Sequence, residues 1–230
     1  MKMKWAVSLL IGFSVASAGE AQGFVNLHFE QAGIYLAPVP QGQAGGSVPI
    51  TSGLPGWSGS FGGNPATQVL HNDLTLGAAS IDILGPQFAA SYIISGNYSV
   101  MLQAGISGSA VDTSITQTGA IPSGINSIQF KASESPGSGA FLVSFGGNTL
   151  SPILLSSGPN YNLYGADVSQ FAGETGPLTF TQVFSSSFPS LLLDDITFST
   201  TSVPEPNSLF LVGFGGAVFA LNRRVRPTIQ

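Results

Sequence analysis

The chain is divided into short apolar or alternating runs, separated by segments rich in Gly, Pro, Ser and Asn. Eleven such runs cover 24–30, 67–71, 74–84, 88–94, 98–104, 114–118, 125–131, 140–145, 150–155, 178–184 and 191–199. Runs of this length, recurring every 8–15 residues or so, favour strands in a sandwich over a helical fold. We therefore predict an all-β chain, folded as an antiparallel β-sandwich of jelly-roll-like form over 24–200.

Polarity alternates within some of these runs. Tyr98, Val100 and Leu102 alternate with polar Ser99 and Gln103. Because successive side chains of a strand point to opposite faces, this pattern predicts one buried and one partly polar face.

Charge is scarce and unevenly placed. Charged residues make up 7% of the 230 positions, and five of the six Lys and Arg residues lie in the first four or last eight positions. Between 24 and 200, Lys131 alone stands against nine acidic residues. This acidic body excludes a nucleic-acid binder, which needs a basic surface. The chain also has no Cys, which excludes disulfides, thiolate metal sites and a Cys nucleophile.

The N-terminal end has the three parts of a secretory signal peptide. Two lysines precede an apolar stretch at 5–15, and Ala16 and Ala18 form a small-x-small cleavage site. The apolar stretch is shorter than the roughly 20 residues of a membrane-spanning helix. We predict a signal peptide at 1–18 and export by the Sec machinery. Cleavage as late as residue 23 and a buried N-terminal helix are the alternatives.

The C-terminal end combines a Pro-Glu-Pro triplet, an apolar stretch at 209–221 and an arginine cluster. The residues are Pro204, Glu205, Pro206, Arg223, Arg224 and Arg226. A short hydrophobic helix is expected over the apolar stretch. Its thirteen residues would reach about 20 Å, less than the hydrocarbon core of about 30 Å. The arginines would hold their end of this helix on the cytoplasmic side.

This tail, over 203–226, resembles the PEP-CTERM sorting signal. The resemblance implies that the triplet is read by exosortase, an integral-membrane cysteine protease of Gram-negative bacteria that make extracellular polysaccharide. It also implies that the three arginines act as a stop signal. Residues 227–230 extend beyond the usual pattern. An ordinary tail anchor after a Pro-rich linker is the alternative.

The body is similar, more loosely, to jelly-roll carbohydrate-binding modules, in the segments 96–100, 117–122 and 193–198. Together the two resemblances imply export across the inner membrane and transient anchoring by the C-terminal helix. The protein would then reach the cell surface or the extracellular matrix. There it would associate with extracellular polysaccharide as a non-enzymatic protein, with exosortase as its processing partner. The alternative is a secreted hydrolase acting on polysaccharide.

Asp194 and Asp195 are neighbours in the run at 191–199. On a regular strand they point to opposite faces and cannot form one catalytic pair. Strict alternation places Asp194 with Leu192, Ile196 and Phe198, buried at one end of the core. A lone buried carboxylate needs donors or a cation. Bonds from loop backbone N–H groups are one interpretation, and a structural Ca²⁺ ion is another; catalysis is a third. No other cofactor is expected.

A Gly- and Pro-rich segment at 31–65 contains nine Gly, five Pro and no charged residue. We predict a long loop or a loosely ordered hairpin. It carries Trp57, whose ring could stack on a sugar in an exposed loop or pack in the core.

Catalytic motifs are absent from the sequence. His28 and His71 lack metal-ligand spacing, and no Gly-x-Ser-x-Gly elbow supports a Ser-His-Asp triad. His71 begins a His-Asn-Asp segment that is typical of a turn between strands. We expect no catalytic residues and no enzymatic activity.

Overall fold

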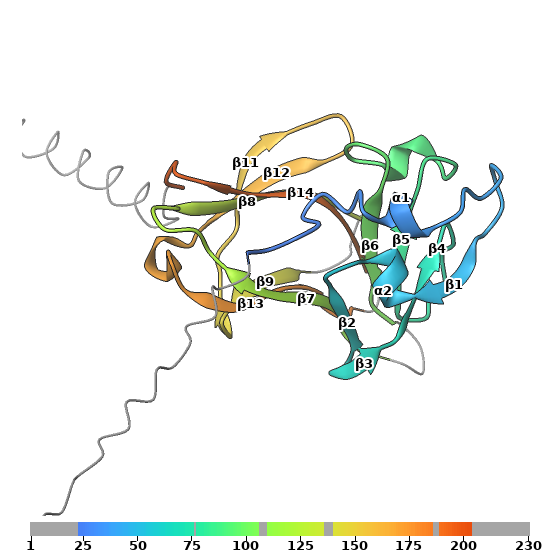
Figure 1. Cartoon of the computed structure of the whole chain (residues 1–230), viewed down its shortest axis with the longest axis horizontal. Helices are drawn as coiled ribbons and strands as arrows, with labels where there is room; N and C mark the ends of the chain where they lie inside the picture. Colours follow the sequence, from blue (N-terminus) through green and yellow to red (C-terminus); the bar gives the residue numbers. More distant parts are fainter. Residues whose placement is uncertain (1–22, 76, 106–109, 136–139, 186–188, 204–230) are drawn as a thin grey trace, which may run out of the picture.

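The computed structural model describes residues 23–75, 77–105, 110–135, 140–185 and 189–203. These residues form two β-sheets packed face to face (Figure 1). The 8-stranded sheet, called the large sheet, has the order β1-β4-β5-β6-β14-β8-β12-β11, and the 6-stranded small sheet has the order β10-β9-β13-β7-β2-β3. The predicted signal peptide lies outside the described residues, as does the tail from 204 onwards.

The strands of the large sheet are β1 (Gly46–Pro49), β4 (Gln68–His71), β5 (Ser80–Leu84), β6 (Ser99–Gln103), β14 (Ser190–Ser199), β8 (Ser127–Glu134), β12 (Asn162–Asp167) and β11 (Ile153–Ser157). Those of the small sheet are β10 (Asn148–Thr149), β9 (Phe141–Phe145), β13 (Thr175–Gln182), β7 (Thr113–Ala120), β2 (Ser58–Phe61) and β3 (Asn64–Ala66). The helices within the described ranges are short: α1 (Ala32–Tyr35), α2 (Ile50–Gly53), and the 3₁₀ turns η1 (Ala90–Tyr92) and η2 (Ser169–Phe171).

The chain crosses repeatedly between the two sheets. It runs from β6 in the large sheet to β7 in the small one, back to β8, and across again to β9; β12, β13 and β14 repeat the movement. This alternation is the jelly-roll arrangement of strands. The predicted all-β, jelly-roll-like sandwich is confirmed; among the paired strands that the structure describes, β4 and β5 alone are parallel.

The main core lies between the sheets. Every second residue of β7 and β13 is buried, and Ile115 pairs with Phe180 in this ladder. The Phe180 ring packs edge-on against Phe130, with centroids 5.1 Å apart. Residues with this alternation bury one face of the small sheet, as the sequence pattern predicts.

The segment at 31–65 is not one long loop; of the two predicted forms, a hairpin is present at its end, where β2 pairs with β3. It folds into α1, β1, α2 and β2 and enters β3. Its glycines allow tight turns between these short elements: Gly46 and Gly56 have φ values of 72° and 85°. Its scattered apolar residues anchor the elements, since Ile50 and Leu54 are buried in the main core.

A second, smaller layer covers the opposite face of the large sheet. Outward side chains of β5, β6 and β14 pack beneath the segments 72–75 and 85–98, around the cluster Leu84, Ile94, Met101 and Leu192. We call these segments and outward side chains the outer layer.

Candidate functional site

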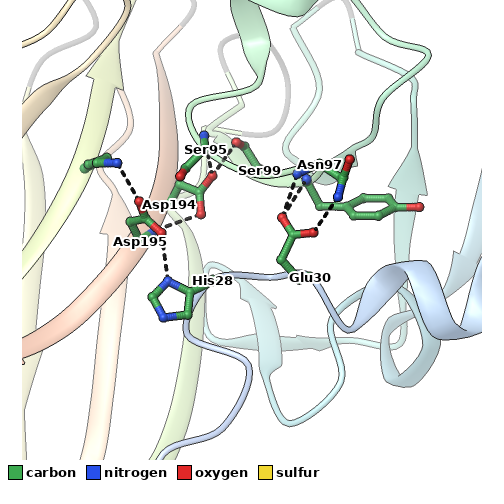
Figure 2. Close-up of polar contacts among 9 residues, drawn as sticks. His28, Glu30, Ser95, Asn97, Ser99, Asp194 and Asp195 are labelled. Carbon is green, nitrogen blue, oxygen red and sulfur yellow. Dashed lines mark hydrogen bonds and ion pairs between the residues drawn. The ribbon is translucent and has the colours of Figure 1, made fainter.

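Asp194 lies in the outer layer with its side chain fully buried (Figure 2). Its Oδ2 accepts hydrogen bonds from Ser99 Oγ at 2.7 Å and from the backbone N–H of Ser95 at 3.1 Å, and its Oδ1 accepts the N–H of Asp195 at 2.7 Å. Burial raises the pKa of Asp194 to about 7. Both oxygens therefore have donors, as in the hydrogen-bonded interpretation.

No group of three or more His, Asp or Glu side chains in the described ranges is arranged to hold a metal ion. A calcium ion at Asp194 stays a prediction.

The expected face for Asp194 is partly wrong. Leu192 does lie on the same face, but Ile196 points into the main core. The reason is a bulge: the β14–β8 register shifts between Asp194 and Thr197, and Asp195 has a positive φ of 48°. One extra residue in the strand reverses the alternation after it.

Asp195 forms an ion-pair cluster at this bulge. Its Oδ2 lies 2.5 Å from Lys131 Nζ, and its Oδ1 lies 2.7 Å from His28 Nδ1 (Figure 2 shows the His28 contact). Burial alone would raise the pKa of Asp195, but hydrogen bonds from Lys131, Ser95 and His28 outweigh it and lower the pKa below its usual value. The paired carboxylate is thus held as an anion by a structural contact.

Glu30 ties the N-terminal segment to the outer layer. Its Oε1 accepts the backbone N–H groups of Asn97 at 2.8 Å and Tyr98 at 3.1 Å, and its Oε2 accepts Asn97 Nδ2 at 3.1 Å (Figure 2). The turn before these donors needs a glycine, because a Cβ on Gly96 would lie 2.2 Å from Glu30 Oε1. These three hydrogen bonds to Glu30 hold one end of the 85–98 segment in place.

Trp57 belongs to the main core and is only 4% exposed. Its ring packs against Phe29 and Phe180, and its Nε1 donates to the carbonyl of Asn26 at 3.2 Å. The prediction of sugar stacking at Trp57 is contradicted, because neither ring face is open to a ligand. The Gly-rich segment folds this residue inward instead of presenting it.

A cleft opens at the edge of the outer layer, with a volume of about 530 Å³. Three chain segments line it: the turn 41–44, residues 72–74 directly after β4, and the segment 87–89 that follows β5. The turn is held against the sheet by a hydrogen bond from Gly45 N–H to His71 C=O at 2.7 Å. The parallel pairing of β4 and β5 brings the other two segments together, because both strands end at this edge.

Four of the ten lining residues carry side-chain amides on an otherwise mostly apolar surface. Gln41, Gln43, Gln87 and Asn72 contribute amides, beside the carboxylate of Asp73 and the rings and chains of Phe88 and Leu74. Lining of this kind, an apolar surface with a few polar groups, is typical of sites for small ligands.

Asn72 has an unpartnered donor at this cleft. The residue is 3% exposed and adopts a left-handed φ of 49°. Its Oδ1 accepts the backbone N–H of Gly85 at 2.6 Å, which fixes the orientation of the amide. Its Nδ2 is buried and has no hydrogen-bond partner. Buried donors without partners are rare in proteins, so this amide is distinct from the other polar groups near the cleft.

Asp82 lies on the neighbouring strand, fully buried. Ser80 Oγ donates to its Oδ2 at 2.8 Å, whereas its Oδ1 has no partner. Burial is the main cause that raises the pKa of Asp82 to about 8, and the charge of Asp73 adds to it. Asp82 does not line the cleft, so it cannot reach a ligand there.

A groove continues the cleft on the other side of the turn 41–44. It has a volume of about 390 Å³ and shares Gln43 and Ala44 with the cleft. Tyr35, 59% exposed, and His71 also line it. Burial lowers the pKa of His71, which favours the neutral imidazole.

The sequence did not identify the cleft. It indicated a turn at His71-Asn72-Asp73, but nothing in the spacing places that turn beside 41–44 and 87–89. The amide side chains clustered on either side of Gly42, at Gln41 and Gln43, were the available signal.

The chain is similar to three solved structures of which it covers most of the length. The carbohydrate-binding module TmCBM61 in complex with beta-1,4-galactotriose is 15% identical, with 62% of this chain and 86% of that chain covered and a TM-score of 0.39. A family 11 carbohydrate-binding module from Clostridium thermocellum, in complex with a beta-1,3-1,4-mixed-linked tetrasaccharide, is 8% identical, with coverages of 70% and 98% and a TM-score of 0.35. A cyclase from Fischerella sp. TAU is 13% identical, with coverages of 76% and 94% and a TM-score of 0.42. No curated protein sequence matches the chain significantly.

The end of the domain leads directly into the tail. The backbone carbonyls of Thr200 and Thr201 accept hydrogen bonds from the side chains of Asn126 and Ser127, and Val203 is buried.

In the part of the chain that the structure describes, no helix is long and apolar enough to cross a membrane. The expected hydrophobic helix at 209–221 lies outside that part. A family profile described as the PEP-CTERM protein-sorting motif matches residues 202–224, which include the triplet, Arg223 and Arg224 but not Arg226. The chain therefore carries a PEP-CTERM protein-sorting motif directly after its β-sandwich domain.

Proposed function

We propose that this is an exported, exosortase-processed surface or matrix protein whose β-sandwich associates with extracellular polysaccharide without catalysing a reaction. The sorting motif at 202–224 is the observation that carries the proposal. The motif implies export, membrane anchoring and processing by exosortase in a Gram-negative host. The Sec machinery is the expected route, through the signal peptide predicted at 1–18.

The position of the motif supports this role. The last strand ends at Ser199, and Pro204 follows the buried Val203. Removal of the tail after the domain would therefore leave the sandwich complete, since its strands all precede the triplet.

The arrangement of carboxyl groups favours a non-enzymatic role. A glycosidase needs two carboxyl groups that reach the scissile bond. Asp194 is buried with both oxygens hydrogen-bonded, Asp195 is paired with Lys131, and Asp82 is buried away from the cleft. Asp73 alone among them lines the cleft.

The test of this proposal is whether the protein is retained in the inner membrane or released from it. The variant Pro204→Ala/Glu205→Ala/Pro206→Ala should remain in the inner membrane of a host with active exosortase, because the recognition triplet is gone. Asn207→Ala/Ser208→Ala, which changes the next two residues, is the matched control and should be released like the wild type. Cell fractionation with immunoblotting measures both. Unchanged release of the triplet variant would refute exosortase sorting.

A further inference from the structure

We propose that the cleft between 41–44, 72–74 and 87–89 is the polysaccharide-binding site and that it selects uncharged sugar chains. This inference rests on the proposed function and deepens it by naming a site and a ligand class. The geometry of three chain segments, fixed by backbone hydrogen bonds, carries it.

The polar groups of the cleft suit hydroxyl groups. An amide offers an acceptor oxygen and a donor nitrogen side by side, and a sugar hydroxyl can both donate and accept. The side chains of Gln41, Gln43 and Gln87 reach the cleft from two of its three walls. A ligand with many hydroxyls can therefore bond to all of them, in either direction.

Asn72 supplies a side-chain amide whose orientation is fixed. The bond from Gly85 N–H holds its Oδ1, so the Nδ2 donor cannot exchange places with the oxygen. This donor is buried without a hydrogen-bond partner, in a residue that borders the cleft. A ligand hydroxyl that reached the donor would satisfy it, and leaving it unpaired costs about 1–3 kcal/mol.

Phe88 supplies an apolar surface. The ring is partly buried and lies edge-on to Tyr92, with centroids 5.3 Å apart at 72°. Packing on one side therefore orients the ring, while the residue still lines the cleft. Sugar rings carry C–H patches that pack on aromatic surfaces of this kind.

Charge excludes anionic polymers. No Lys, Arg or His lines the cleft, and Asp73 adds a carboxylate to it. Lys131, the one Lys or Arg side chain in the described part of the chain, is engaged by Asp195. A uronate or sulfated chain would meet repulsion here with no cation to compensate.

The adjoining groove extends the site. Because Gln43 and Ala44 border both hollows, a linear chain could pass over the turn toward the exposed ring of Tyr35. The ligand class is thus an oligosaccharide or polysaccharide in preference to a single sugar.

Affinity electrophoresis of the full chain, purified in detergent, tests the proposal. The probes are gels cast with dextran, galactan or mixed-linked β-glucan, and gels cast with the anionic polymer alginate. At least one neutral polymer should retard the protein, and alginate should not.

Phe88→Leu keeps apolar volume but loses the flat ring face, and Gln87→Ala removes an amide; each should weaken retention about tenfold or more. Gln170→Ala, an exposed amide on η2 away from the cleft, is the matched control and should bind like the wild type.

Asn72→Asp refines the test. Asp tolerates the left-handed backbone and keeps an acceptor for Gly85 N–H, but it removes the Nδ2 donor. Thermal melts of every variant check that the fold is intact. Retention that persists in all three cleft variants overturns the cleft assignment but leaves polysaccharide association standing. Absence of retention in every gel, or equal retention by alginate, overturns the proposal. Sorting is read out separately, because cleft variants should be released normally.

Discussion

The two faces of the large sheet use the same strands but are stabilised differently. On β5, Ile81 and Ile83 point into the main core, whereas Ser80 and Asp82 point into the outer layer. The inner face is mostly apolar, so its stability comes mainly from buried area, at roughly 25 cal/mol per Å². The outer face buries polar groups, and each of these needs a partner.

Most of the polar side-chain atoms described in the outer layer have hydrogen-bond partners, and two do not. Asp194 has three donors and Glu30 has three, but Asp82 Oδ1 and Asn72 Nδ2 have none. Asp82 lies on β5 and Asn72 directly follows β4, but only Asn72 borders the cleft. The comparison teaches that the inner face is stabilised by apolar packing, whereas the outer face keeps two unsatisfied polar groups, one of them in a residue that borders the cleft.

The largest effect should follow from breaking the inner face. Phe180→Ala removes a fully buried ring that contacts Trp57 and Phe130. We expect the free energy of unfolding to fall by about 3–5 kcal/mol, from lost burial and the cavity left behind. Urea unfolding of the purified protein measures this. Leu154→Ala, at a 54% exposed position on the edge strand β11, should cost less than about 0.5 kcal/mol. Equal costs would mean that the main core is not where we place it.

A smaller effect should distinguish the outer face from the inner face: its buried carboxyl groups should make the free energy of unfolding depend on pH. Burial raises the pKa of Asp82 from 3.8 to about 8, so the folded state keeps a proton that the unfolded state loses. Stability should therefore fall as the pH rises from about 4 to about 8 and then level off. Asp194, raised to about 7, contributes in the same direction.

Asp82→Asn should flatten part of this slope and stabilise the fold above about pH 8, by at least about 1 kcal/mol. Urea unfolding at a series of pH values measures the change. Glu174→Gln is the control, because this side chain is exposed to water, and it should leave the slope as it is. A wild-type stability that rises over the same window would contradict the burial of a protonated Asp82.

The inner face could be predicted from the sequence because its signal is local. The runs at 114–118 and 178–184 fall on β7 and β13, and their alternation matches the buried residues. The two-sheet class follows from patterns of period two, and the closing run at 191–199 falls on β14. The runs at 24–30 and 88–94 form no strand, and the second contains the turn η1 instead.

The outer layer could not be predicted, because its features depend on register. A positive φ at Asp195 reversed the facing of Ile196, and no pattern in the sequence marks that bulge. The sequence left sugar stacking and core packing both open for Trp57, and short elements between the glycines carry it into the core. The cleft depends on the parallel pairing of β4 and β5, which joins residues from three separate segments.

The smallest effect should come from the ion pair at the bulge. Lys131 Nζ lies 2.5 Å from Asp195 Oδ2 and 4.9 Å from the centroid of the Tyr161 ring, but both charged side chains remain about a quarter exposed. Lys131→Met, which keeps apolar contact with the ring, should therefore lower the free energy of unfolding by only about 0.5–1 kcal/mol. The hydrogen bond to Asp195 raises the pKa of Lys131, and the pKa of Asp195 is lowered. The contribution of Asp195 should be complete above its unfolded pKa of about 3.8 and be lost as the pH falls through the lower folded value.

Lys131→Arg, the matched control, should retain most of the pairing. Salt near 1 M, where the screening length is about 3 Å, should shrink the difference between wild type and Lys131→Met. A loss above about 3 kcal/mol that salt does not reduce would instead assign the pair to a dry interior, and the outer face would then resemble the inner one more than the structure indicates.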